Sequence, residues 1–258
     1  METIEKKYRQ LENDTRTVDG KTLYRVEAIK DFGSIEKGDK GGYIESEDNL
    51  SQEGECWVFG DARVCGDARV CGDAWVSGEA CVSGDAWVSG DARVCGDAWV
   101  SGEACVSGDA RVCGDAWVYG KAQVYGKAWV YGKARVCGGA QIYENAWVSG
   151  KARVSENACV SENACVSGEA CVSGNAWVFG NARIRGTADY YVGKNVWSSG
   201  RYFTYTRSNK MWKVGCFYGT GEELIAKAYR DSEVSGREYE RVVKYVEAMY
   251  ADLEKDKE

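Results

Sequence analysis

The 258-residue chain contains no histidine and no proline. Without histidine, imidazole is excluded as a general base near neutral pH and as a metal ligand. The lack of proline suits a long strand ladder, because every backbone N–H can donate. No apolar run is long enough to span a bilayer, and no charged-then-apolar leader opens the chain, so we expect a cytoplasmic protein. Because the net charge is −7, we expect the protein to bind neither membranes nor nucleic acids directly.

A six-residue period runs through the middle of the chain. Val or Ile occupies every sixth position from Val58 to Ile184, in 22 successive hexapeptides. Ala precedes it by two residues in all but the first unit, where Cys56 stands. Because alternate side chains of a strand point to opposite faces, the Ala and Val positions form a buried face. Self-similarity at one strict period indicates a solenoid.

The residues between these strands are typical of tight corners. Most units continue with Gly and an acid, and glycine permits positive φ at little cost. Three units carry Glu-Asn instead, as at Glu144-Asn145, and Asn is the next best residue for a left-handed corner. Three hexapeptides would close a triangular coil of about eighteen residues. We therefore predict an all-β solenoid, a three-sided parallel β-helix of about seven such coils.

Twelve cysteines are present, without any Cys-x-x-Cys pair. Ten occupy two fixed slots of the repeat, so Cys159, Cys165 and Cys171 fall on different sides of a coil and cannot converge on a metal. Cys95 and Cys113 would stack about 4.8 Å apart, near the lower limit for a disulfide. In a reducing compartment we expect free thiols throughout, and we predict no metal site and no cofactor.

The period lies between two segments that lack it. Residues 1–55 suggest a small β cap, with strands near 22–26 and 41–44. Residues 191–258 suggest an α+β cap, with a hairpin of 201–206 and 211–217, a helix capped by Thr220 and a longer helix from Ser235. We assign the β-helix to residues 56–190.

The repeat resembles the left-handed parallel β-helix of hexapeptide-repeat proteins, and that resemblance alone implies the left hand. The segment from Gly41-Gly42-Tyr43-Ile44 to Val58, together with the C-terminal tail, resembles poorly characterised bacterial and phage or prophage members. Some of these are labelled acetyltransferases. The resemblance implies a homo-oligomer, a trimer, and in the acyltransferases a catalytic histidine and an extruded loop. This chain has no histidine and no insertion between 58 and 184, which disfavours that activity.

The outward strand positions carry tryptophan and arginine, which dominate binding hot spots. When residues eighteen positions apart are grouped together, these side chains form one column on each of the three faces. The predicted interaction face takes residues from the first two columns: Trp57, Trp75, Arg93, Arg111, Trp99 and Trp117. An alternative is that stacked Trp and Arg only stabilise the helix, by about 0.5–1 kcal/mol each, or that repeat duplication copied them.

Charge changes sign along the rod. The corner slot is acidic in ten consecutive repeats, from Asp61 to Asp115, and then switches to Lys121, Lys127 and Lys133. One corner between the first and second faces combines aromatic planes with cations, which suits a nucleotide, since stacking contributes about 1–3 kcal/mol per base. The alternative is a solvated charge corner. The predicted ligand-binding residues are Trp129, Tyr131, Lys133, Arg135, Trp147, Lys151 and Arg153.

These patterns favour a non-catalytic binding protein with no catalytic residues. By resemblance it would be a phage or prophage counter-defence factor that sequesters a nucleotide-like ligand or blocks a host protein. A structural or oligomeric scaffold and, least favoured, an acyltransferase are the alternatives. The acid ladder does not imitate DNA, because its spacing of about 4.8 Å differs from the ~7 Å between phosphates along one strand.

Overall fold

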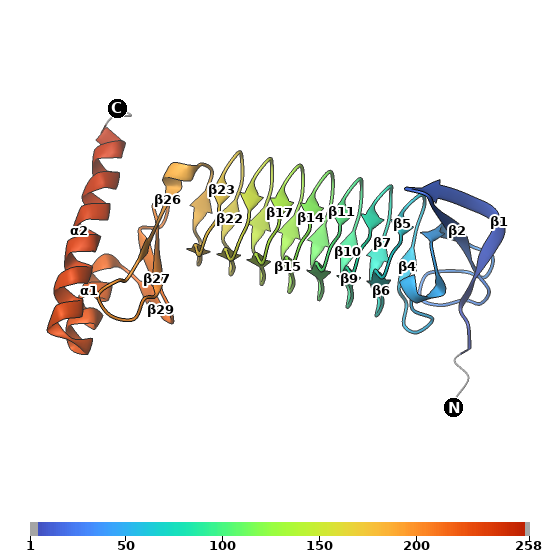
Figure 1. Ribbon diagram of the computed structural model, residues 1–258, viewed down its shortest axis with the longest axis horizontal. Coiled ribbons are helices and arrows are strands. Elements are labelled where there is room, and N and C mark those ends of the chain that lie inside the picture. Colours follow the sequence, from blue (N-terminus) through green and yellow to red (C-terminus); the bar gives the residue numbers. More distant parts are fainter. Residues whose placement is uncertain (1–4, 256–258) are drawn as a thin grey trace.

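A computed structural model, described for residues 5–255, shows a rod with a cap at each end (Figure 1). The body is a parallel β-solenoid of 22 two-residue strands, from β4 (Trp57–Val58) to β25 (Arg183–Ile184). Consecutive strands lie on different walls, and strands that pair are three apart in chain order. This confirms the predicted three-sided β-helix with eighteen residues per coil, as in the pairing of Trp99 with Trp117.

The three walls correspond to the three predicted faces. The first wall contains β4, β7 (Trp75–Val76), β10 (Arg93–Val94), β13 (Arg111–Val112), β16 (Trp129–Val130), β19 (Trp147–Val148), β22 (Cys165–Val166) and β25. The second wall contains β5 (Arg63–Val64), β8 (Cys81–Val82), β11 (Trp99–Val100), β14 (Trp117–Val118), β17 (Arg135–Val136), β20 (Arg153–Val154) and β23 (Cys171–Val172). The third wall contains β6 (Arg69–Val70), β9 (Trp87–Val88), β12 (Cys105–Val106), β15 (Gln123–Val124), β18 (Gln141–Ile142), β21 (Cys159–Val160) and β24 (Trp177–Val178).

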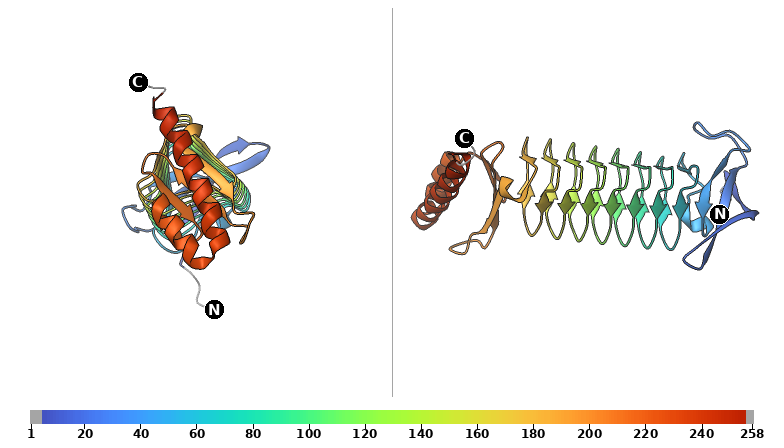
Figure 2. Two further views of the ribbon diagram at one scale, coloured as in Figure 1. Left: turned by 90° about the vertical axis from the view of Figure 1, so that its left-hand side faces the viewer. Right: turned by 90° about the horizontal axis from the view of Figure 1, so that it is seen from above.

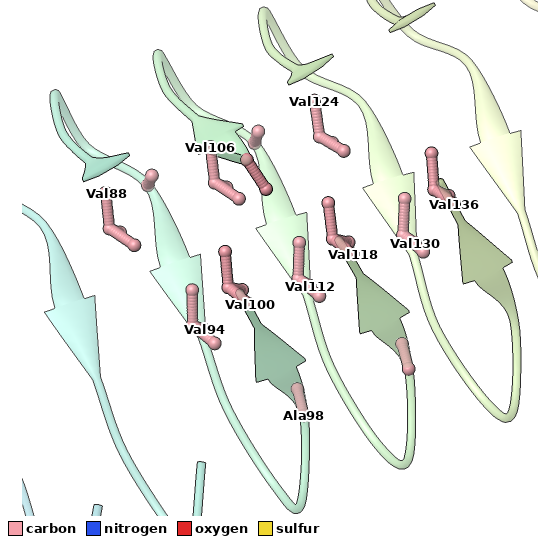
Figure 3. Packing of buried hydrophobic residues seen from close by; sticks show 14 of the residues in the cluster. Val88, Val94, Ala98, Val100, Val106, Val112, Val118, Val124, Val130 and Val136 are labelled. Atoms are coloured by element: carbon pink, nitrogen blue, oxygen red, sulfur yellow. The ribbon is translucent and has the colours of Figure 1, made fainter. Parts of the chain in front are cut away.

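The solenoid interior consists of the repeated valines and alanines. From Val58 to Ile184, every side chain of these two slots is 0% or 1% exposed. The valines of the three walls point toward one another across the interior, as Val94, Val100 and Val106 do (Figure 3). Each buried valine contributes about 1.5–3 kcal/mol, an upper estimate because the unfolded chain is already partly compact. Stability is therefore spread along the rod.

Backbone hydrogen bonds join each coil to the next. The amide of Trp99 donates to the carbonyl of Ala116 over 2.9 Å, and that of Trp117 donates to Ala134 over 2.9 Å. The two donors, like the two acceptors, are 18 residues apart, which is the length of one coil. A proline in these amide positions would remove a rung, which accounts for the absence of that residue from the repeat.

The corners depend on positive φ. At Gly114 φ is +71°, and an added Cβ would lie 3.2 Å from the backbone nitrogen of Gly132 in the next coil. In the three Glu-Asn corners it is the glutamate that adopts this conformation: φ is 57° at Glu144, 61° at Glu156 and 57° at Glu162. The prediction that asparagine supplies the left-handed residue is wrong, because glutamate fills the glycine slot and asparagine the acid slot after it.

The N-terminal cap contains β1 (Tyr8–Val18), β2 (Lys21–Ala28), β3 (Lys40–Ile44) and a short 3-10 helix, η1 (Glu47–Asn49). The two predicted strands correspond to β2 and β3, whereas β1 had no clear sequence pattern. β3 pairs in parallel with β5 and so extends the second wall. The side-chain amide of Asn49 donates to the carbonyls of Gly66 and Ala68. The cap thus covers the first coil and provides hydrogen-bond donors for its backbone carbonyls.

The C-terminal cap contains the 3-10 helix η2 (Thr187–Asp189) and the antiparallel strands β26 (Tyr190–Lys194), β27 (Tyr202–Thr206), β28 (Met211–Val214) and β29 (Phe217–Gly219). The helices α1 (Gly221–Asp231) and α2 (Glu233–Lys255) follow, and α2 lies across the end of the rod (Figure 2). The predicted capping box is present, with Thr220 and Glu223 bonded reciprocally. This confirms the α+β cap.

The last coil is closed in the same way as the first. The amide of Trp177 donates to Thr204 Oγ1 over 2.9 Å, and that of Arg183 donates to Ser208 Oγ over 2.7 Å. Both ends of the solenoid are therefore covered, so the first and last coils do not offer open strand edges to another molecule. Within residues 5–255, no helix is both long and apolar enough to cross a membrane.

Candidate functional site

Most of the outward tryptophans are exposed, but the first is not. Trp87 is 51% exposed and Trp147 is 43% exposed, whereas Trp57 is only 1% exposed. Tyr8 and Phe32 of the N-terminal cap pack edge-on against Trp57, with ring centroids 6.1 and 5.4 Å away. The assignment of Trp57 to an exposed interaction face is therefore wrong, because the cap uses this indole as its anchor.

The first wall carries a nearly continuous column of stacked planes. The Arg93 guanidinium lies 5.2 Å from the Trp75 ring, and that of Arg111 lies 4.8 Å from the Trp129 ring. The Trp129 and Trp147 rings are 5.2 Å apart and only 3° from parallel. These distances are typical of cation–π and stacking contacts. The column therefore stabilises itself while it presents its edges to solvent.

The second wall carries a similar set of stacked side chains. The rings of Trp99 and Trp117 are 5.4 Å apart and 13° from parallel, and the Arg135 guanidinium lies 5.2 Å from the Trp117 ring. Arg153 follows Arg135 in register. Of the predicted interaction residues, Trp99 and Trp117 thus form one stacked pair, separate from the column on the first wall.

The predicted ligand corner is only partly assembled. Tyr131 contacts Trp147 edge-on at 6.1 Å, so the aromatic residues do converge. The two lysines instead pair with acids of neighbouring coils: Lys133 with Asp115 at 3.9 Å and Lys151 with Glu169 at 2.8 Å. The hydrogen bond that Lys151 donates to the Glu169 carboxylate raises the pKa of Lys151. These exposed ion pairs contribute little stability. They do mean that the two lysines expected to hold a phosphate already have carboxylate partners.

On the other side of Trp147 the first-wall column is interrupted. The next residue in register is Cys165, and Arg183 follows it one coil further. A cavity of about 360 Å³, which we call the first-wall notch, opens here to solvent. Its lining residues are Asn145, Trp147, Asn163, Cys165, Ser167, Arg183 and Arg185. Of these residues, only Trp147 was predicted to belong to the site. The replacement of Trp by Cys at the next position of the column, Cys165, is the feature of the sequence that could have indicated the others.

The cysteines differ from the prediction at one position. Cys95 and Cys113 of adjacent coils form a disulfide, with Cα atoms 4.6 Å apart, so the expectation of free thiols is wrong for this pair. Ten other cysteines are free. A hydrogen bond from Cys65 and the nearby Arg63 guanidinium lower the pKa of the Cys81 thiol to about 7, against the effect of burial. Across residues 5–255, no three Cys, Asp or Glu side chains are placed to share a metal ion.

The fold places the chain among parallel β-solenoids, with a column of tryptophan and arginine side chains on the outer surface of the first wall. Residues 62–78 match the model of the YdcK beta solenoid repeat family. That segment is just under one coil, so the similarity concerns the repeat. No curated protein matches the sequence. A solenoid of this kind is compatible with a non-catalytic or scaffold role.

Proposed function

We propose that this protein is a non-catalytic binding protein that sequesters a nucleotide-like ligand. The observation that carries the proposal is the column of indole rings and guanidinium groups on the first wall, where Trp147 remains 43% exposed beside arginines. Indole faces stack with nucleobases of any sequence, and guanidinium groups bind phosphate through two parallel hydrogen bonds.

The rigidity of the solenoid supports this role. Side chains on a hydrogen-bonded ladder lose little further freedom on binding, so less affinity is lost to ordering. The chemistry of the chain also favours binding over turnover, because the sequence offers no imidazole for proton transfer.

A phage or prophage counter-defence setting rests on the resemblance of residues 41–58 and of the C-terminal tail to such proteins. In that setting the ligand would be a nucleotide signal of the host, or the columns would block a host protein. We expect the same wall to serve in either case.

Native mass spectrometry of the protein, with and without a nucleotide extract from cells, tests the proposal. We expect a retained small molecule that isothermal titration calorimetry then confirms with purified nucleotides. Hydrolysis or acetyl transfer on addition of nucleotide or acetyl-coenzyme A would contradict a non-catalytic role. Capture of a protein alone, without any nucleotide, would replace the ligand by a host partner.

A scaffold is the second candidate, favoured by the exposed pair Trp99 and Trp117 on the second wall. Because caps cover both ends of the ladder, assembly would be lateral, through the walls. Size-exclusion chromatography with light scattering distinguishes the two: a closed trimer or a concentration-dependent series indicates assembly, and a monomer that binds nucleotide indicates sequestration.

A further inference from the structure

In the first-wall column, Trp75 and Trp129 each have a ring or guanidinium neighbour on two sides. Trp75 lies between Phe59, at 5.0 Å, and Arg93. Trp129 lies between Arg111 and Trp147. Trp147 has Trp129 on one side only, because the residue on its other side is Cys165. One indole face in this column is therefore left without a stacked partner among the residues that the structure describes.

The gap above Trp147 has the dimensions of one missing plane. Coils are about 4.8 Å apart, so Trp147 and Arg183 are separated by about 10 Å. One ring between two planes needs at least about 7 Å, twice a van der Waals contact of ~3.5 Å, and two rings would need more than about 10 Å, so the gap accepts a single ring. The first-wall notch of about 360 Å³ occupies this space, within the usual range of about 300–1,000 Å³ for ligand sites.

The second wall shows that a cysteine in the column does not by itself create a notch. There Trp99 is followed by Cys81 and then by Arg63, the same three residue types in the reverse direction. Cys81 is only 6% exposed, and the Nε of Arg63 is buried as well. That gap is filled, whereas Cys165 remains partly exposed.

The charges of the notch also differ from those of the predicted corner. Among residues 5–255, no carboxylate lies within ion-pair distance of Arg183 or Arg185, whereas Lys133 and Lys151 each have one. The amides of Asn145 and Asn163 lie together at the edge of the notch, with Nδ2 and Oδ1 3.5 Å apart. The site therefore combines an open indole face, two available guanidinium groups and two amides.

We propose that the first-wall notch binds a nucleoside monophosphate, with its base in the place that a tryptophan side chain would take at position 165. The base stacks between Trp147 and Arg183, as Trp129 stacks between Trp147 and Arg111. Arg185 takes the phosphate, and the asparagine amides bond the polar edge of the base. This site rests on the proposed function and moves the ligand from the predicted corner to the opposite face of Trp147.

Filling the notch tests the assignment directly. Cys165→Trp supplies the missing plane with a residue that this slot accepts elsewhere in the chain. Cys105→Trp, in the same slot on the third wall, is the matched control. Binding of AMP, GMP, CMP and UMP is measured by calorimetry. We expect one site per chain in the wild type and in Cys105→Trp, and at least a 100-fold loss of affinity in Cys165→Trp.

Two further variants keep the test independent of how well Cys165→Trp folds. Trp147→Leu removes the stacking plane and should weaken binding about 5- to 150-fold. Arg183→Gln removes one cation, so it should weaken binding and reduce its dependence on salt. Ribose 5-phosphate and the free nucleosides, which lack the base or the phosphate, should each bind more weakly than the nucleotide.

The outcomes separate the site from the function. Nucleotide binding that survives in Cys165→Trp, Trp147→Leu and Arg183→Gln overturns the notch and leaves sequestration standing elsewhere on the surface. Failure of the wild-type protein to bind any of the four nucleotides overturns both. Equal binding of ribose 5-phosphate and nucleotide overturns the stacked base.

Discussion

The three glutamates with positive φ offer a sharp test of how the corners of the solenoid are stabilised. Glu156 adopts φ of 61° in a slot that glycine fills in most coils. Within residues 5–255 its side chain forms no hydrogen bond or ion pair that would offset this conformation. We therefore predict that Glu156→Gly stabilises the protein.

The size of the effect follows from two opposing terms. The left-handed conformation costs a residue with a Cβ about 1–2 kcal/mol. Glycine recovers that amount but loses about 0.5–1 kcal/mol more conformational entropy on folding. The net gain should be about 0.5–1 kcal/mol, which corresponds to a rise in Tm of about 1–4 °C for a chain of this size.

Glu144 provides the matched control, because it has the same backbone conformation and a compensating contact. Its φ is 57°, and its carboxylate accepts the backbone N–H of Glu162 in the next coil over 2.8 Å. Glu144→Gly relieves the same strain but loses this charge-assisted bond, worth about 1 kcal/mol at an exposed corner. We expect no net gain.

Thermal and urea unfolding, followed by circular dichroism, measure both variants against the wild type. The m-value should stay constant, because neither change alters the surface exposed on unfolding. Equal Tm shifts for the two variants would show that the carboxylate bond at Glu144 contributes nothing. A fall in Tm for Glu156→Gly would refute the argument from backbone strain.

Three further predictions concern the caps and the coils between them. Trp57→Ala should cost about 3–5 kcal/mol in thermal unfolding because the ring is buried, whereas Trp87→Ala should cost clearly less because half of that residue is exposed; similar losses would contradict the role of Trp57 as an anchor. Reduction of the Cys95–Cys113 disulfide, which spans 18 residues, should lower stability by about 3 kcal/mol, with no effect of reductant on a Cys95→Ser variant. Burial, reinforced by Asp189, raises the pKa of Tyr250 from 10.0 to about 12. The folded state therefore holds this proton more tightly, and the stabilisation is complete below pH 10 and lost as pH rises toward 12; urea unfolding at both ends of this range should show a smaller drop for Tyr250→Phe.

The winding of the rod could be predicted because it is encoded locally and repeated. In each hexapeptide between Val58 and Ile184, the residue types indicate which side chains face inward and where the corner lies. The 22 copies exclude any period other than six residues. The walls followed from the period alone, since residues eighteen apart must stack once three strands close a coil. The α+β cap followed from helical spacing and the capping box at Thr220.

The candidate site could be predicted only in part. The column of Trp147, Cys165 and Arg183 was readable from the period, but the stacking of Trp147 on Trp129, which leaves its other face open, depends on side-chain conformations. The pairing of Lys133 and Lys151 with acids could not be predicted from the aromatic residues, because it depends on which charge lies in the neighbouring coil.

Sequence by itself determined the period, the inward face and the order of residues in each column, because these depend only on spacing along the chain. Only the tertiary structure decided that Trp57 is buried beneath a cap, that Cys95 and Cys113 are joined, and that a notch opens at Cys165. Each of these depends on contacts between segments or on the direction a side chain takes, and a repeating pattern carries no information about either.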